Sequence, residues 1–169
     1  MRGQSAFCRA KERPRPRAGK GSDLVRSLMS FWAARLGVLV VLAAGATYWD
    51  LRSRRVPNAL TFSCALAGLA MGGLERGGAG LLPPAAGLLV AGGVFLPFVV
   101  LGYVGGGDMK LLAAAGALLG PVGAVWAVLF GAVLGGAWAL AWVAVRGKGK
   151  WLPYAPPLAA GAVASFFVA

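Results

Sequence analysis

The sequence contains no histidine, and this absence excludes most of the familiar hydrolytic machinery. Ser–His and Cys–His nucleophile pairs need an imidazole base, and the HExxH zinc site needs two imidazole ligands. The two cysteines, Cys8 and Cys64, have neither the spacing of a metal site nor a pattern that pairs them with each other. No metal site, cofactor or disulfide framework is therefore expected, and any hydrolysis must rely on carboxylates.

Charge is also scarce, because only 13% of the residues are charged whereas 59% are hydrophobic, with a mean hydropathy of +0.73. A soluble domain carries about 25% charged residues, so this composition predicts a protein of the lipid bilayer. The net charge is +12, but eight of the 17 Lys and Arg residues precede residue 30 and the others lie in short loops. Because a nucleic-acid-binding domain presents a basic face on a folded surface, nucleic acid is not an expected partner.

The chain divides into a basic tail and a long apolar region. Residues 1–30 contain the run RPRPR and no apolar periodicity, which predicts a disordered tail. Residues 31–169 alternate apolar runs with polar, glycine-rich or proline-rich breaks, which predicts a membrane domain. The predicted spans are 31–49, 58–74, 84–102, 109–120, 121–145 and a last one after Pro153. The expected fold is all-α, with about six transmembrane helices.

The fourth and fifth of these spans come from one uninterrupted apolar run. Residues 109–145 carry no charge except Lys110, and a single helix of that length would reach ~55 Å. The hydrocarbon core of a bilayer is only ~30 Å thick, so the run must fold back on itself. Gly120 and Pro121 form the expected break.

Acidic residues are rarer still, and two of the five lie against predicted spans. The other three are Glu12 and Asp23 in the tail and Glu75 in a predicted loop. Asp50 ends the first span and Asp108 begins the fourth, so two intervening crossings return the chain to the same membrane face. Ionisable groups at that depth are costly and are functional candidates by default. The alternative is that both are helix caps or ion partners of Arg52 and Lys110.

The face that holds both aspartates is also the basic one. Its basic residues are Arg52, Arg54, Arg55, Lys110, Arg146, Lys148 and Lys150, whereas the opposite loops hold little beyond Arg76. The positive-inside rule therefore predicts that this face is cytoplasmic. The tail contradicts this topology, because its basic residues would have to lie outside. A true start at Met29, with the preceding residues an extension, would remove the conflict.

Two carboxylates held close in a low-dielectric site cannot both ionise cheaply, so they share one proton. The ionised member of such a pair takes a proton from a bridging water, which attacks a scissile carbonyl. The protonated member donates to the developing oxyanion and then to the leaving nitrogen. The aspartate pair therefore indicates peptide hydrolysis that needs neither metal nor cofactor.

Two stretches resemble the aspartate motifs of the type IV prepilin peptidase family. Asp50-Leu-Arg-Ser-Arg-Arg-Val-Pro-Asn58 is similar to D-x-x-x-x-R-I/V-P-N, and Gly105-Gly-Gly-Asp-Met-Lys110 is similar to GxGD-x-K. The closing segment WLPYAPPLAAG resembles the final span of the family. The chain lacks the paired CxxC motifs of the larger members, so it resembles the short peptidase-only branch, including the type associated with tight-adherence (Flp) pili. Methylation of the new pilin N-terminus is not implied.

The resemblance implies a GxGD-type aspartic peptidase with Asp50 and Asp108 as its catalytic pair. The other matched positions, which would shape the site, are Gly105, Gly107, Lys110, Arg55, Pro57 and Asn58. The implied substrate is a prepilin or pseudopilin, with a short basic leader followed by an apolar helix. Cleavage would occur at the cytoplasmic face of the bacterial inner membrane, with pilus or secretion assembly machinery as a further partner.

Other interpretations of the same residues stand beside this one. In a small-molecule or ion transporter, both aspartates would be proton or cation sites in a polar cavity, although no internal repeat is visible. In a catalytically silent component of pilus assembly, asparagine at either position would be tolerated. The glycines before Asp108 are expected to permit a close helix approach and unusual backbone angles, which would let the carboxylate enter a crowded, water-accessible notch, but they also fit a plain turn. Lys110 also fits an interfacial anchor, and Pro57 with Asn58 the start of a helix.

Overall fold

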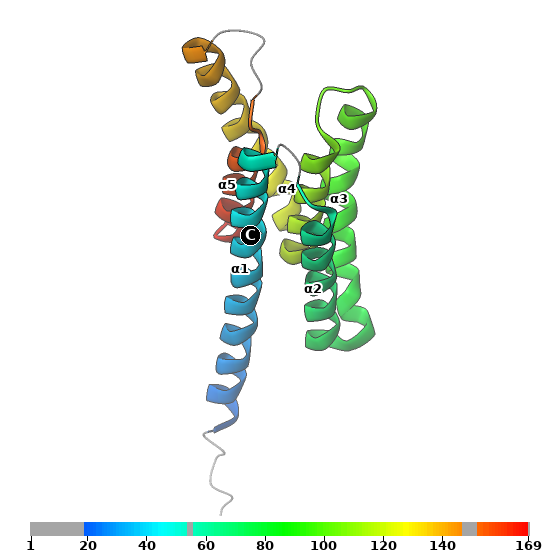
Figure 1. The fold of residues 1–169 in the computed structure, drawn as a ribbon. Helices are drawn as coiled ribbons and strands as arrows, with labels where there is room; N and C mark the ends of the chain where they lie inside the picture. The colour runs from blue at the N-terminus through cyan, green and yellow to red at the C-terminus, as the bar shows by residue number, and fades with distance from the viewer. Residues whose placement is uncertain (1–18, 54–55, 147–151, 169) are drawn as a thin grey trace, which may run out of the picture.

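A computed structural model describes residues 19–53, 56–146 and 152–168, and within these ranges the regular structure is entirely helical. Its elements are α1 (Gly19–Ser53), α2 (Asn58–Arg76), the short 3₁₀ helix η1 (Gly77–Leu81), α3 (Leu82–Val100), α4 (Gly106–Arg146) and α5 (Ala155–Phe166). Figure 1 shows α1 beside α5, α2 beside α3, and α4 passing between these pairs. The all-α class predicted from the sequence is confirmed.

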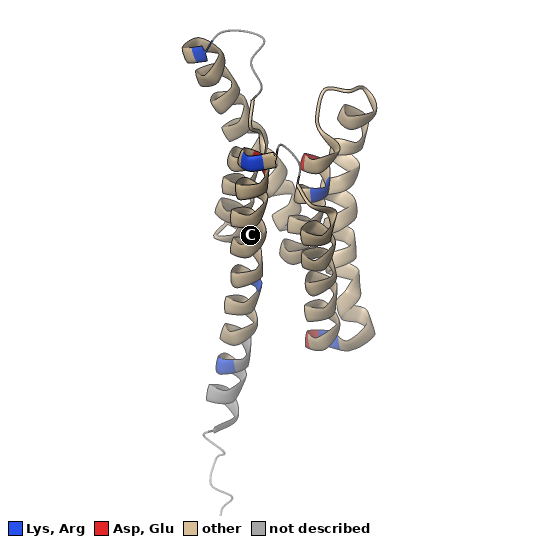
Figure 2. Ribbon diagram, in the orientation of Figure 1, with Lys and Arg blue, Asp and Glu red and all other residues tan. Residues whose placement is uncertain are grey.

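Three stretches are long and apolar enough to cross a membrane: Met29–Ser53, Asn58–Val100 and Gly106–Arg146. Large apolar side chains lie on the outside of the molecule, for example Leu89 and Val133, which are 70% and 68% exposed. Long lengths of α2, α3 and α4 contain no charged residue (Figure 2). Such a surface is suited to lipid and not to water, so the chain is a membrane protein.

The second stretch contains two helices that run in opposite directions. Pro57 has extended backbone angles and precedes α2, as expected for a residue that starts a helix without joining it. After Arg76 the chain turns through η1, where Gly77 has a φ of 65°, a conformation that glycine adopts at little cost. The carbonyl oxygen of Gly72 lies where an added Cβ on Gly80 would be, so α2 and η1 meet closely. The residues expected to form the second and third spans thus correspond closely to the helices α2 and α3.

The predicted break in the long apolar run occurs at the expected residue. Gly120 has a φ of 75° and a ψ of −177°, so α4 consists of two helices joined at this glycine, with Pro121 directly after it. Gly87 of α3 packs against the backbone at Gly116 and Gly120, where an added Cβ would overlap the Gly116 carbonyl oxygen. Small residues therefore bring α3 close to α4 at the bend.

One predicted boundary is wrong. The sequence predicts a disordered tail over residues 1–30, but α1 begins at Gly19, so residues 19–30 are helical. These residues contain no proline, and adding turns to an existing helix costs far less than nucleating a new one. The apolar stretch of α1 that is suited to the bilayer begins at Met29. The prediction for residues 1–18 lies outside the described residues.

Glu75 also differs from its expected place. It lies in the last turn of α2, and not in a loop, and its Oε2 is 3.0 Å from Nη2 of Arg35 on α1. This ion pair ties α1 to α2 at the end of α2 that is remote from Asn58, the first residue of the helix (Figure 2). At the other end, the last turn of α1 and the first turns of α2, α4 and α5 come together (Figure 1).

Candidate active site

Asp50 lies in the last turns of α1 and is half-buried. Its Oδ2 accepts a hydrogen bond of 3.2 Å from the backbone N–H of Ala155, the first residue of α5. The aspartate therefore sits against the amino end of a helix from another part of the chain, where the helix dipole favours negative charge. Within the described residues, neither Asp50 nor Asp108 forms an ion pair, so the alternative that they pair with Arg52 and Lys110 is not seen.

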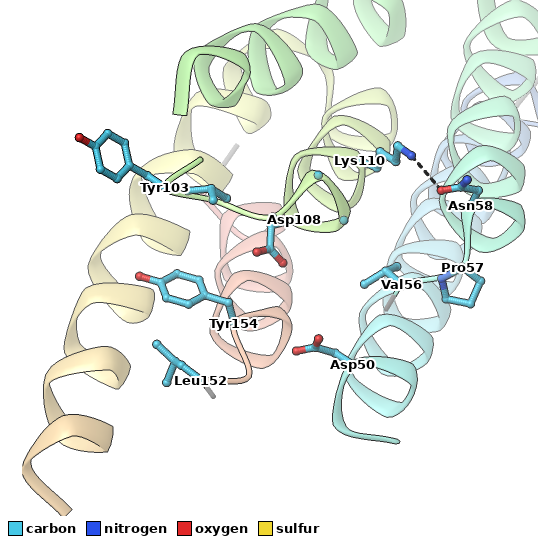
Figure 3. Close-up of a pocket in the computed structure, with 13 residues that line it drawn as sticks. Asp50, Val56, Pro57, Asn58, Tyr103, Asp108, Lys110, Leu152 and Tyr154 are labelled. Carbon is cyan, nitrogen blue, oxygen red and sulfur yellow. Dashed lines mark hydrogen bonds between the residues drawn. The ribbon is translucent and has the colours of Figure 1, made fainter. Parts of the chain in front are cut away.

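Asp108 lies in the first turn of α4 and is half-buried. Its backbone N–H donates to the carbonyl oxygen of Gly105 at 3.1 Å, which fixes the turn that leads into the helix. In Figure 3 the carboxyl groups of Asp108 and Asp50 reach from opposite sides into one space. The two aspartates come from helices that are far apart in the sequence, and the fold brings them together.

A cavity of about 720 Å³ contains both aspartates. Its lining residues are Asp50, Val56, Pro57, Asn58, Tyr103, Val104, Gly105, Gly106, Gly107, Asp108, Lys110, Leu152 and Tyr154. The set includes all the site residues predicted from the sequence except Arg55, which lies outside the described residues. The residues that line the cavity thus come from the end of α1 and the stretch after it, from the stretch before α4 and its first turns, and from the stretch before α5 (Figure 3).

A side-chain hydrogen bond connects the two sequence motifs. Nζ of Lys110 donates to Oδ1 of Asn58 at 2.9 Å, so the first turn of α2 is tied to the first turns of α4 (Figure 3). Both side chains are exposed at the edge of the cavity. Lys110 thus has a structural partner in addition to the interfacial position that the sequence predicts.

The glycines of the second motif do not have the backbone role that was expected of them. Among the described residues, glycines with positive φ are Gly77, Gly102 and Gly120, so Gly105 and Gly107 have ordinary angles. A Cβ on Gly107 would lie 3.7 Å from Val56, and one on Gly105 would lie 3.5 Å from Oδ2 of Asp108. Both distances are ordinary contacts. The absence of side chains here keeps the cavity open beside Asp108 and does not relieve strain.

Sequence reasoning missed the contributions of Tyr103, Leu152 and Tyr154 to the cavity. The sequence predicts that Leu152 and Tyr154 lie at the start of the last span, and it assigns neither residue to the site. The local sequence carries no signal for these contributions, because they arise from contacts between segments that are far apart in the chain. Among the described residues, no group of three or more His, Cys, Asp or Glu side chains forms a metal-binding cluster.

An all-helical membrane protein with two aspartates in one cavity has the parts of an intramembrane hydrolase. The sequence profile of the type IV leader peptidase family matches residues 36–140, more than half of the chain. The chain therefore belongs to the type IV leader peptidase family, which confirms the resemblance found in its motifs. The matched range includes Asp50 and Asp108 and ends before α5. No significant match was found among curated proteins or among solved structures.

Proposed function

We propose that this protein is an aspartic endopeptidase that removes the short leader peptide from a prepilin or pseudopilin. The observation that carries the proposal is the shared cavity, in which Asp50 and Asp108 face the same space from different helices. Membership of the leader peptidase family supports the choice of substrate. Each of the two sequence motifs supplies one carboxyl group to this cavity.

In the proposed reaction, one carboxylate takes a proton from a water molecule held between the two aspartates. The water oxygen bonds to the carbonyl carbon of the scissile peptide, while the protonated carboxyl gives its proton to the carbonyl oxygen. The tetrahedral intermediate then collapses, and a hydroxyl proton returns to the carboxylate that had donated one. The same carboxyl then passes this proton to the leaving nitrogen as the C–N bond breaks. The pair again shares one proton, now on the other aspartate, and one water has been consumed.

The experiment that tests the function is co-expression with the prepilin encoded nearest in the genome. The host should lack its own leader peptidases, so that any shortening of the prepilin depends on the added protein. We expect a faster-migrating pilin whose new N-terminus, read by mass spectrometry, follows the basic leader. Unchanged prepilin with an abundant, membrane-inserted protein would contradict the proposal for that substrate class.

The proposed topology has six crossings: α1, α2, α3, the two arms of α4, and α5. The active-site end would face the cytoplasm, because Arg52, Lys110 and Arg146 lie in the terminal turns at that side of the helices. The last crossing is short, since the 12 residues of α5 reach only ~18 Å as a helix. Its neighbours and the flanking residues would have to complete the passage through the bilayer.

A reporter fused after Ala169 should be located in the periplasm, because six crossings that start outside return the chain to the outside. The measurement compares alkaline phosphatase, active only in the periplasm, with green fluorescent protein, fluorescent only in the cytoplasm. A cytoplasmic signal would show that α5 does not cross, and the span count would then be five. A second reporter inserted within residues 147–151 should be cytoplasmic and serves as the internal control.

Chelators should leave cleavage unchanged. The proposed reaction draws its proton transfers from two carboxyl groups, and the described residues contain no cluster suited to hold a metal ion. The measurement is the rate of prepilin cleavage in detergent after dialysis against EDTA, compared with a mock-dialysed sample. Loss of activity that added zinc restores would contradict the metal-free mechanism.

A further inference from the structure

The stretch before α5 contributes to the cavity although it lies beyond the range that matches the family profile. Leu152 and Tyr154 line the cavity, and Ala155 donates its backbone N–H to Oδ2 of Asp50 at 3.2 Å. This bond is directed at one of the two proposed catalytic carboxyls. The stretch 152–155 therefore acts on the site through a backbone group that no side-chain motif reveals.

The sequence makes this amide the single donor of its helical turn. Pro156 and Pro157 follow Ala155 and have no N–H, and the next amide, that of Leu158, donates to the carbonyl oxygen of Tyr154. The first turn of an ordinary helix offers several unsatisfied N–H groups, which could hold a carboxylate in more than one orientation. Among the described residues, the carboxyl group of Asp50 accepts from this one donor, through Oδ2. In the proposed reaction, Oδ1 is the oxygen left to hold the reacting water.

Two contacts from the second arm of α4 hold the stretch in place. Nε1 of Trp138 donates to the carbonyl oxygen of Pro153 at 3.1 Å. One turn earlier, Gly135 accommodates the ring of Tyr154, because an added Cβ would lie 2.9 Å from Cε1 of that ring. Pro153 itself is fully buried. The position of the Ala155 amide is therefore set by α4 through the indole of Trp138 and the gap at Gly135.

We propose that Trp138 is a positioning residue of the peptidase, which holds the Ala155 amide against Asp50 by fixing the carbonyl group of Pro153. The proposal rests on the proposed catalytic function of Asp50. Trp138 is not among the residues that line the cavity, and its effect is transmitted through the three consecutive residues Pro153, Tyr154 and Ala155. The amide in turn sets the rotation of the Asp50 carboxyl and supports the negative charge that this group carries while it is ionised.

The molecule supplies a matched control for Trp138. Trp142 lies one turn further along α4, with its ring centroid 6.0 Å from that of Trp138. Its Nε1 is buried and has no hydrogen-bond partner among the described residues. Replacement of either tryptophan by phenylalanine removes the same atoms, but only Trp138→Phe removes a hydrogen bond to the stretch before α5. The difference between the two variants isolates that bond from the loss of packing.

Trp138→Phe should lower kcat of prepilin cleavage about tenfold with KM changed less than twofold, because the reacting carboxyl is displaced while substrate binding is retained. Trp142→Phe should keep both constants within about twofold of the wild type. Thermal unfolding in detergent is measured for both variants, so that a general loss of stability is recognised. Equal kcat in the two variants would overturn the positioning role of Trp138.

A direct test replaces the Ala155 amide by an ester, by incorporation of lactic acid at position 155 in cell-free translation with nanodiscs. This change removes the N–H group that donates a hydrogen bond to Asp50 and keeps the methyl side chain of residue 155. The ester should lower kcat about tenfold, as Trp138→Phe does, and the two changes together should be no worse than either alone. An ester at Leu158, which removes a bond within α5, is the control and should have a smaller effect on kcat. Full activity of the Ala155 ester would overturn the proposal.

Failure of this proposal can be told apart from failure of the proposed function. If Asp50→Asn abolishes cleavage while Trp138→Phe and the Ala155 ester remain fully active, the peptidase stands and the positioning role is wrong. If Asp50→Asn is itself active, the function proposed for Asp50 is wrong, and the positioning role falls with it.

Discussion

Asp50→Asn and Asp108→Asn should each reduce prepilin cleavage by a factor of at least ~100 while the protein stays folded and inserted. An amide has nearly the shape of a carboxyl group but can neither take a proton from water nor give one to the carbonyl oxygen. In the case of Asp50, the asparagine Oδ1 still accepts the Ala155 N–H, so the contact between α1 and α5 is kept. The measurement is cleavage in the co-expression assay, with membrane abundance determined in parallel.

Another acid, Glu75, provides the control. Glu75 lies in the last turn of α2, outside the cavity that holds the two aspartates, and Glu75→Gln keeps an oxygen that can accept from Arg35. This variant should cleave at the wild-type rate. Residual activity above a few per cent in either aspartate variant would exclude the paired mechanism.

Gly87→Val should prevent the accumulation of folded protein. A Cβ at this position would overlap the carbonyl oxygen of Gly116 and lie 2.7 Å from the carbonyl carbon of Gly120, so α3 would have to move away from α4. Backbone atoms cannot move aside as the end of a flexible side chain can. Overpacking of a close interface therefore destabilises the folded state by ~1–3 kcal/mol or more. The expected result is a large loss of membrane-inserted protein and a much lower unfolding temperature in detergent.

Gly93→Val is the matched variant for this experiment. Gly93 lies on the same helix, and an added Cβ there would meet nothing within 4 Å, so the substitution should be tolerated. Normal abundance of Gly87→Val would show that α3 and α4 are not held together at the bend. Equal loss in both variants would point to the effect of valine on helix formation instead of the interface.

The sequence was sufficient for the parts of this molecule that depend on local chemistry. The scarcity of acids singled out Asp50 and Asp108, and the parity of crossings placed them at one face. A glycine followed by proline located the bend at Gly120, because a proline cannot continue the hydrogen bonding of a helix. Each of these inferences uses residues that are close in sequence or a simple count of spans.

The rest depends on contacts that have no local pattern. The sequence around Trp138 does not indicate that its indole donates a hydrogen bond to the carbonyl oxygen of Pro153. The sequence around Asp50 likewise does not indicate that a backbone amide of α5 lies beside it. The sequence does not predict that α1 begins at Gly19, because the composition of residues 19–30 indicates disorder. Composition does not show that a helix formed by the following residues can extend into this segment. The glycines before Asp108 were expected to take unusual angles, yet their function in this fold is to leave space.

The place of Ala155 in the chain affects how active members of the family are counted in genomes. Both aspartates and the residues that link their motifs lie within 36–140, so a gene that ended soon after the second arm of α4 would still satisfy every motif and the family profile. Such a protein would lack the amide that faces Asp50. If the Ala155 amide supports Asp50 as proposed, surveys that score the two motifs alone would overestimate the number of working peptidases. The residues equivalent to 152–157 should then be inspected before a truncated homologue is assigned an activity.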